Sequence, residues 1–315
     1  MRPFSQTSPT SCCCAGRKRD APLPRPRAVA QRVVTVVALV MALAACQGRA
    51  EAPAASAAPT PRLVSVNPAA TAIVDALGAS AHLVGVTRYC RVAGVPVVGD
   101  TMPPLDRILA RTPDAVLIGD YPSQRPLREQ LSALGVRVIV VPTVTLADLR
   151  ASTRALGREL GAEDRASALV ADIDEALAAA KARAAQRDRV RALFVFDIQQ
   201  GYVYTTGGHD HLAELLDAVG ADNVAAGGPL TSRLALDAVL ARAPELILHA
   251  APSERFPDDA AARRYWREAL PNVPAVARGQ VYVWPDDRLA QNAPWIASAV
   301  GPMADLVAAA AAARP

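Results

Sequence analysis

The chain has 315 residues, of which 51% are hydrophobic, and a formal net charge of +4. Seven basic residues and one acidic residue precede Cys46, which leaves 27 basic and 29 acidic residues, a net charge of −2, in the remainder. The positive charge is therefore a property of the N-terminal segment. Charge gives no argument for nucleic-acid binding, and we expect none.

Residues 1–45 are predicted to be a secretion signal. A short apolar run from Val33 to Ala45 follows three arginines and ends in the lipobox pattern Leu43-Ala44-Ala45-Cys46. The small residues before Cys46 let a peptidase reach the bond, after which the Cys46 thiol is lipidated. The run has roughly 13 apolar residues, whereas a transmembrane helix needs about 20. We therefore expect a periplasmic lipoprotein that is anchored to the inner-membrane surface.

Residues 46–61 are rich in Ala, Pro and Ser, and we expect them to form a disordered tether. The following residues, about 250 in number, suffice for two lobes with separate cores. After processing, only Cys46 and Cys90 remain, so no intrachain disulfide is expected.

The first lobe, residues 62–161, is predicted to alternate strands with helices. A strand at 62–66 stops at Asn67-Pro68, and a helix at 69–77 ends at Gly78. Further strands are expected at 83–86, 115–118 and 136–141, and helices at 104–111, 124–134 and 146–160. This alternation indicates an α/β lobe with a mainly parallel sheet, and the unbroken apolar strands indicate a sheet covered on both faces.

Residues 162–188 are predicted to form one connecting helix, because apolar residues recur at i, i+3, i+4 and i+7. A single packed rod should allow only small relative motion of two lobes. The second lobe, residues 189–315, is predicted to have strands near 191–196, 202–205, 245–248 and 280–284. Helices are expected at 211–219, 236–242, 258–269 and 293–313.

Two short motifs of the first lobe recur in the second. The run Leu105–Asp114, LDRILARTPD, returns as Leu236–Glu245, LDAVLARAPE. Residues 75–79, DALGA, return as residues 217–221, DAVGA. Both echoes occur in the same order, which favours a duplicated unit over a chance likeness of Ala-rich and Leu-rich helices. Two similar lobes suggest a clamp around a ligand.

In combination, several segments resemble the substrate-binding proteins of ABC importers for iron chelates, haem and cobalamin. These segments are Leu63–Thr71, Leu83–Cys90, the helix that begins at Leu105-Asp106, the connecting helix, and Ala218–Val224. The resemblance implies two Rossmann-like lobes with mainly parallel sheets, joined by one long backbone helix. It also implies a monomer without cofactor or catalysis, which binds a metal chelate in the cleft and delivers it to a permease dimer with its ATPase.

The resemblance also implies two docking residues. The family carries a Glu on one helix of each lobe, which meets basic pockets of the permease, and this chain has Asp106 and Asp237 there. It departs from the family at Ala72, where a Glu is usual. The alternative is that both aspartates only stabilise the first turn of a helix through its dipole.

Ligands of open α/β sheets lie beyond the carboxyl ends of the strands, so loops after strands should line the cleft. Tyrosine rings suit a flat macrocycle, and guanidinium groups can bind carboxylates, although any single arginine could equally be a solvated surface charge. The candidate ligand-binding residues are Asn67, Arg88, Tyr89, Tyr121, Arg125, Tyr202, Tyr204, His209, Arg233 and Arg288.

Tyr89, Tyr121 or His209 could ligate haem iron. The sequence His209-Asp210-His211 also suggests metal binding, but Asp210 could instead cap a helix, and further ligands for a bare zinc ion cannot be identified. Cobalamin is less favoured, since the tryptophans of cobalamin binders have no counterpart near Asp100 or Leu230. Cys90 is either a small buried side chain or a reactive thiol without an evident base.

Two other functions remain open. One is a receptor for bare Zn²⁺ or Mn²⁺ ions, and the other is a secreted α/β enzyme. The sequence has no Gly-x-Ser-x-Gly elbow, phosphate loop, dinucleotide fingerprint or paired carboxylates at a strand end. The sequence therefore favours binding over catalysis.

Overall fold

The computed structural model describes residues 61–315, which belong to one compact unit. The predicted signal, the lipidation site Cys46 and the tether up to residue 60 lie outside the described residues. None of the helices within residues 61–315 is long and apolar enough to cross a membrane.

The first lobe is built on a parallel sheet with the strand order β3-β2-β1-β4-β5. Its strands are β1 (Leu63–Ser65), β2 (Leu83–Thr87), β3 (Val97–Gly99), β4 (Ala115–Gly119) and β5 (Arg137–Val141). All residues of β1 and β4 are buried, as their unbroken apolar sequence predicts. The sequence did not predict β3, which has only three residues and therefore shows no periodicity.

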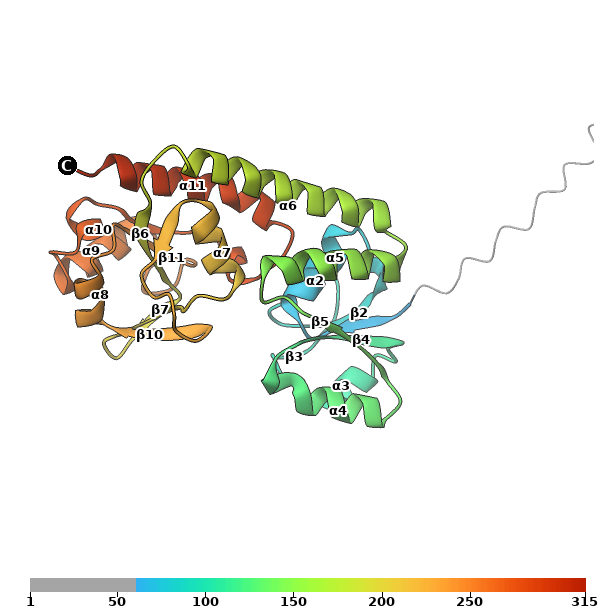
Figure 1. Ribbon diagram of the computed structural model, residues 1–315. Helices are drawn as coiled ribbons and strands as arrows, with labels where there is room; N and C mark the ends of the chain where they lie inside the picture. The colour runs from blue at the N-terminus through green and yellow to red at the C-terminus, as the bar shows by residue number, and fades with distance from the viewer. Residues whose placement is uncertain (1–60) are drawn as a thin grey trace, which may run out of the picture. The chain divides into compact units, whose positions relative to one another are not determined.

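Helices cover both faces of this sheet (Figure 1). They are α2 (Pro68–Ala76), α3 (Leu105–Leu109), α4 (Arg125–Ala133) and α5 (Leu146–Leu160), with short 3₁₀ turns at Ser80–His82 and Pro122–Gln124. Leu63 and Leu117 point toward α2 and α5, whereas Val64 and Val116 pack with Ile108 of α3 and Leu127 of α4. The helix α3 is shorter than expected because Thr112, before Pro113, has a positive φ of 45°.

The connecting helix α6 (Glu163–Ala184) buries one apolar stripe along its length. Its residues Leu169, Ile173 and Leu177 belong to a single cluster that includes α2 and α5 of the first lobe and α7 (His211–Ala218) and α11 (Ile296–Ala312) of the second. Figure 1 shows α6 alongside α11 and reaching above α5. One core therefore runs through both lobes.

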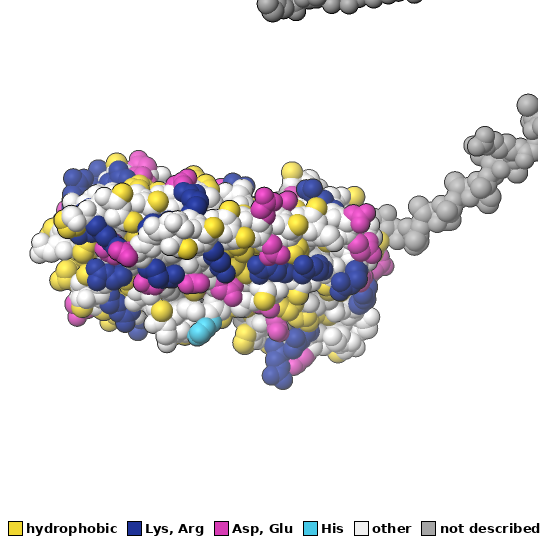
Figure 2. All heavy atoms as spheres, turned by 45° about the horizontal axis from the view of Figure 1, so that its top comes forward, with side chains coloured by type: hydrophobic (Ala, Val, Ile, Leu, Met, Phe, Trp, Pro, Cys, Tyr) yellow, Lys and Arg dark blue, Asp and Glu magenta, His cyan; other side chains and the backbone are white. Residues whose placement is uncertain are grey.

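Ion pairs add to this attachment at the surface. Arg150 of α5 bonds Asp174 of α6 at 2.6 Å, and Arg183 of α6 bonds Asp305 of α11 at 2.5 Å. Figure 2 shows basic and acidic side chains lying beside one another on one face of the molecule. Such exposed pairs contribute little individually, so the apolar stripe is the main restraint on α6.

The second lobe contains two sheets. A parallel sheet has the order β12-β11-β6-β9, formed by β6 (Val190–Val195), β9 (Ala221–Asn223), β11 (Leu246–His249) and β12 (Val281–Val283). A separate antiparallel sheet has the order β10-β8-β7, formed by β7 (Asp197–Gln199), β8 (Tyr202–Thr206) and β10 (Thr231–Ala235). The predicted fold class, two α/β lobes with mainly parallel sheets, is confirmed.

The sequence analysis did not predict the antiparallel sheet or β9. Gln200 and Gly201 both have positive φ, 49° and 79°, and join β7 to β8 as a two-residue hairpin turn. A Gln-Gly turn is a weak signal, since Asn or Asp usually precedes the glycine. The three residues of β7 are likewise too few to show alternation.

The remaining helices of the second lobe are α8 (Leu236–Arg242), α9 (Asp259–Ala269) and α10 (Pro274–Ala277). Trp266 of α9 is fully buried and donates its indole N–H to Nε2 of His249, 2.9 Å away. Burial lowers the pKa of His249 to about 4, so this imidazole is neutral at physiological pH.

Candidate functional site

A cavity of about 480 Å³ lies between the lobes. Loops that follow β1, β3, β4 and β5 form its wall in the first lobe, and loops after β6 and β8, with residues 290–292, form most of its wall in the second. It thus opens at the carboxyl ends of strands, where open α/β sheets bind ligands. The lining residues are Asn67, Pro68, Ala69, Thr101, Tyr121, Ser123, Gln124, Thr143, Val144, Phe196, Asp210, His211, Leu212, Leu230, Thr231, Ala290, Gln291 and Asn292.

Hydrogen bonds hold the first-lobe wall in place. The amide of Gln124 accepts from the backbone N–H of Gly119 at 2.7 Å and donates to the carbonyl of Val66 at 3.2 Å. The hydroxyl of Tyr121 lies 3.2 Å from that of Thr143. A Cβ on Gly119 would lie 2.5 Å from the Tyr121 ring, so only glycine lets this ring fold back over the strand end.

Asn67 is part of the same wall, but its polar atoms are already used. Its side-chain oxygen accepts from the backbone N–H groups of Ala69 and Ala70 and so caps α2, while its amide N–H lies 3.4 Å from the carbonyl of Val141. Only 2% of the residue is exposed. Asn67 thus shapes the wall by fixing the start of α2.

Asp210 and His211 form the opposite wall at the start of α7. Asp210 caps this helix by accepting from the backbone N–H of Ala213 at 2.9 Å, and it accepts a second bond from the hydroxyl of Thr206 at 2.7 Å. Nε2 of His211 lies 3.0 Å from the carbonyl of Leu289. Burial lowers the pKa of His211, which keeps its imidazole neutral and makes Nε2–H the donor of this bond.

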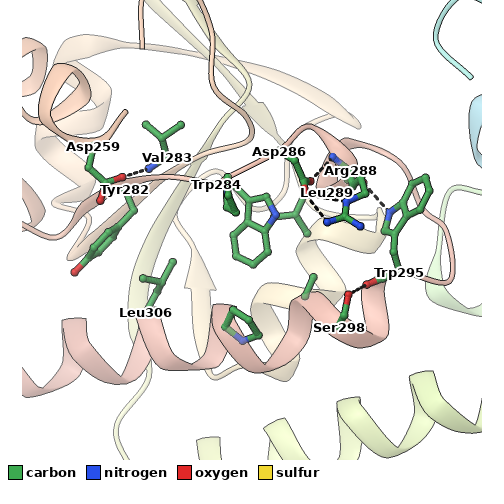
Figure 3. Close-up of a pocket in the computed structure, with 13 residues that line it drawn as sticks. Asp259, Tyr282, Val283, Trp284, Asp286, Arg288, Leu289, Trp295, Ser298 and Leu306 are labelled. Atoms are coloured by element: carbon green, nitrogen blue, oxygen red, sulfur yellow. Dashed lines mark hydrogen bonds and ion pairs between the residues drawn. The ribbon is translucent and has the colours of Figure 1, made fainter. Parts of the chain in front are cut away.

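The segment 284–295 carries the last part of the cavity wall, and Figure 3 shows how it is held from behind. The indole N–H of Trp295 donates to the carbonyls of Arg288 and Gln291, at 2.9 and 3.2 Å. Asp286 accepts from the side chain of Arg288 at 2.6 Å, and this bond lowers the pKa of the Asp286 carboxyl. A separate pocket of about 410 Å³ lies behind the segment, against α11.

Several bonds join the two lobes beside the cavity. The side-chain amide of Asn292 donates to the carbonyls of Thr143 and Thr145, at 3.1 and 2.6 Å. Glu214 accepts from the backbone N–H of Leu146 at 2.6 Å. At the rim, Arg91 of the first lobe forms an ion pair with Asp287 of the second, and the Gln291 amide lies 3.5 Å from the carbonyl of Tyr89.

The structure places the predicted ligand-binding residues in different surroundings. Asn67 and Tyr121 line the cavity. Tyr89 is half exposed. It lies beside the cavity, where its carbonyl contacts the side chain of the lining residue Gln291. His209 instead lines another groove, of about 610 Å³, together with Lys181 and Asp217. Its neighbour His211 is the histidine that reaches the cavity.

Tyr202, Tyr204 and Arg233 lie along the antiparallel sheet. Thr206 pairs with Thr231 at the cavity end, and Tyr202 lies four residues further along β8, roughly 14 Å away. The guanidinium of Arg233 stacks over the Tyr202 ring at 4.6 Å. These three side chains therefore occupy a surface that leads away from the cavity.

The other predicted arginines are engaged with carboxylates. Arg88 pairs with Asp100, Arg125 with Glu129 at 2.8 Å, and Arg288 with Asp286. None of the three is among the cavity-lining residues of the described chain. Each one nevertheless lies near a lining residue in the chain. Arg125 follows Gln124, Arg288 lies two residues before Ala290, and Asp100, the partner of Arg88, precedes Thr101.

Gln124, Phe196, Gln291 and Asn292 line the cavity but were not predicted from the sequence, and His211 was considered only as part of a metal-binding motif. The strand-end rule does find most of their loops. It does not reveal which side chain of a loop faces inward, because that depends on packing between loops distant in sequence. Amides and neutral histidines also carry no charge that would draw attention to them.

No group of three or more His, Cys, Asp and Glu residues within 61–315 is arranged to hold a metal ion. Cys90 is partly buried, and its Sγ lies 3.0 Å from the hydroxyl of Thr71 and 3.2 Å from that of Thr87. These neighbours are hydroxyl groups, which do not act as bases toward a thiol.

The sequence model of the periplasmic binding protein family matches residues 63–288, and the chain therefore belongs to that family. The vitamin B12-binding protein of Vibrio parahaemolyticus is 26% identical over 221 residues, which cover 68% of this chain and 78% of that protein. A periplasmic heme-binding protein from Pseudomonas aeruginosa has a TM-score of 0.69 at 22% identity and covers 80% of this chain and 94% of its own. At that identity the likeness shows the fold alone.

An uncharacterized ABC transporter substrate-binding lipoprotein of Bacillus subtilis is 29% identical over 174 residues. The match covers 52% of this chain and 55% of the Bacillus protein, so the chain spans about half the length of that relative.

Asn292→Ala tests the link between the lobes. The change removes two hydrogen bonds and leaves the carbonyls of Thr143 and Thr145 without this donor, so we expect the free energy of unfolding to fall by about 2 kcal/mol. Urea denaturation followed by circular dichroism measures this loss. Asn272→Ala, at an exposed position, is the control and should change stability by less than about 0.5 kcal/mol. Equal stability of the two variants would contradict the assigned role.

Proposed function

We propose that this chain is the substrate-binding protein of an ABC importer. It captures a metal chelate, namely a ferric siderophore, haem or cobalamin, between its lobes and delivers it to an inner-membrane permease with its ATPase. Family membership supports the transport role. The names of relatives that bind vitamin B12 or heme support the class of ligand.

The observation that carries this proposal is the cavity and its apolar rim. Tyr121, Phe196 and Leu230 line the cavity and are 39%, 37% and 46% exposed. Large exposed apolar side chains that gather at one place mark binding sites, and a cavity of a few hundred cubic ångströms suits a small molecule. Tyr121 belongs to the first lobe and the other two to the second, so a bound ligand would bridge both.

If the ligand is haem, the cavity favours Tyr121 as the iron ligand among the three residues considered. Tyr121 lines the cavity, whereas Tyr89 lies at the rim and His209 lines another groove. The bond between the hydroxyls of Tyr121 and Thr143 orients the phenol. A phenolate is an established axial ligand of haem iron.

The binding test uses the protein as its host processes it, extracted in mild detergent. Cyanocobalamin, haemin, ferrichrome, ferric enterobactin and Zn²⁺ are titrated by absorbance and tryptophan fluorescence. We expect saturable binding of at least one chelate, weakened about tenfold by Tyr121→Ala because a central aromatic contact is lost. Leu134→Ala, which removes an exposed apolar side chain outside the cavity, is the control and should keep full affinity.

Two outcomes would contradict the proposed function. Binding of none of the chelates would refute a chelate-binding role, and binding of Zn²⁺ alone would select the bare-metal receptor instead. Full affinity in Tyr121→Ala would place the ligand elsewhere on the molecule.

We further propose that Asp106 and Asp237 meet the permease. Both are exposed in the first turn of their helices, α3 and α8, one on each lobe. The Asp237 carboxylate also accepts from the backbone N–H of Ala238 at 2.8 Å, so it stabilises its helix as well. Exposed carboxylates at matching positions of two lobes suit two basic pockets of a permease dimer.

Asp106→Lys and Asp237→Lys separate docking from binding. We expect each to abolish uptake in cells while leaving chelate affinity unchanged, because the reversed charge faces the permease and neither residue lines the cavity. Asp172→Lys, at an exposed position of α6, is the control and should keep normal uptake. Loss of chelate affinity in either docking variant would contradict this role.

We propose a periplasmic location with a lipid anchor at Cys46. The support is the lipobox, which lies outside the described residues, and the name of the lipoprotein relative from Bacillus subtilis. Metabolic labelling with a radioactive fatty acid should mark the protein and fail to mark Cys46→Ala. Equal labelling of both would refute the anchor.

A further inference from the structure

We infer that the cleft selects a chelate that carries no net negative charge at its periphery and presents N–H or O–H donors. This inference rests on the proposed function and specifies the chemistry of its ligand. It follows from the polar groups of the cavity and from the partners of the arginines around it.

The polar lining consists almost entirely of amides and hydroxyls. Among the cavity-lining residues of the described chain, none is Lys or Arg, and the ionisable ones other than tyrosine are Asp210 and His211. Asp210 is committed to capping α7, and burial keeps His211 neutral. The amide and hydroxyl side chains are those of Asn67, Thr101, Ser123, Gln124, Thr143, Thr231, Gln291 and Asn292.

Four arginines around the cavity, and Arg233 on the antiparallel sheet that leads away from it, are each held by another group. Four form ion pairs with carboxylates, and the fifth stacks on a tyrosine ring. These contacts are Arg88 with Asp100, Arg91 with Asp287, Arg125 with Glu129, Arg288 with Asp286, and Arg233 over Tyr202.

An anionic ligand would therefore gain little from these arginines. An anion can reach the free N–H groups of these exposed guanidiniums, but a carboxylate of the protein already balances each positive charge, so the anion is attracted less than by an unpaired arginine. The four pairs contribute no net charge, which leaves one positive charge on Arg233 and one negative charge on the lining residue Asp210. Asp197, next to the lining residue Phe196, adds a further exposed carboxylate. The surroundings of the cavity thus offer no net positive charge to an anion.

Two cavity-lining residues also carry a side-chain oxygen that accepts no hydrogen bond. The side-chain oxygens of Gln291 and Asn292 are buried and have no hydrogen-bond partner. The orientation of the Asn292 amide is fixed, because its nitrogen donates to the carbonyls of both Thr143 and Thr145. An unpaired buried acceptor is costly, and a ligand N–H or O–H admitted by a small movement of the lobes would satisfy it. A carboxylate has no such hydrogen.

Three pairs of probes of similar size test the inference on the detergent-extracted protein. Each pair joins a neutral chelate to an anionic one: cyanocobalamin and its monocarboxylate, in which one peripheral amide is hydrolysed; haemin dimethyl ester and haemin; ferrichrome and ferric enterobactin. The haemin pair tests charge alone, because the ester offers no N–H or O–H donor. We expect the neutral member of the pair that binds to be favoured by about tenfold. Equal or tighter binding of the anionic member would overturn the inference and leave the proposed function intact. Binding of none of the six would refute the proposed function and this inference with it.

Variants that remove the carboxylate partner of an arginine test whether these ion pairs cause the preference for a neutral chelate. Asp100→Asn frees Arg88 and Asp286→Asn frees Arg288, and each should strengthen binding of the anionic member about fivefold. Glu159→Gln is the matched control, because it breaks the ion pair with Arg137 outside the cavity lining and should change neither affinity. Circular dichroism establishes that each variant is folded. Unchanged affinity for the anion in both released variants would show that arginine pairing does not set the preference.

Discussion

The apolar stripe of α6 packs against helices of both lobes, and the geometry of the cleft depends on this contact. Leu169, Ile173 and Leu177 share one buried cluster with α2 and α5 on one side and α7 and α11 on the other. Each lobe also has a smaller core that does not reach the connector. The lobes are therefore two folded units that both pack on α6 and are also joined by direct bonds such as those of Asn292. Large opening would separate buried apolar side chains along its length, which the hydrophobic effect opposes.

If the lobes move little, ligand recognition depends on the loops that line the cleft. The cavity is bounded by strand ends from both parallel sheets. Buried or partly buried hydrogen bonds fix these loops to their own lobes: Gln124 to Gly119, Asp210 to Ala213, and Trp295 to Gln291. Bonds such as those of Asn292 then join the two walls directly. The pattern describes a cleft whose walls are held by bonds within and between the lobes, and we propose that its amide and hydroxyl lining and the paired arginines select the ligand.

The sequence predicted the framework of this molecule better than its site. The helices 146–160 and 236–242 were predicted with their observed bounds, and the connecting helix ends four residues earlier than expected. Their periodicity is a local property, and so is the repeat that reveals two lobes. The strands β3, β7 and β9 have three residues each, and, unlike the equally short β1 and β12, they lack a clear apolar pattern, since β3 lies between Pro96 and Asp100 and β7 and β9 each contain an aspartate. The role of Asn292 could not be predicted, since its partners lie about 150 residues away in the chain.

The surroundings of the charged candidate residues could not be predicted from the sequence for the same reason. From the sequence alone, an arginine in a strand-end loop is a candidate to bind a carboxylate of the ligand. That a carboxylate of the protein, such as Asp100 or Glu129, already pairs with it can be identified only in the folded chain. His209 and His211 are two positions apart in the chain. His209 nevertheless lines the groove with Lys181 and Asp217, whereas His211 lines the cavity, because α7 begins at His211.

The central claim is that α6 holds the lobes nearly fixed. It is tested most directly by pulsed electron paramagnetic resonance between spin labels at Leu134→Cys and Leu240→Cys, exposed positions on the two lobes. The chain for this measurement begins at residue 47 and carries Cys90→Ser. We predict one narrow distance distribution whose mean moves by less than about 3 Å when the tightest-binding chelate is added. A broad or bimodal distribution, or a shift of about 10 Å, would contradict the account.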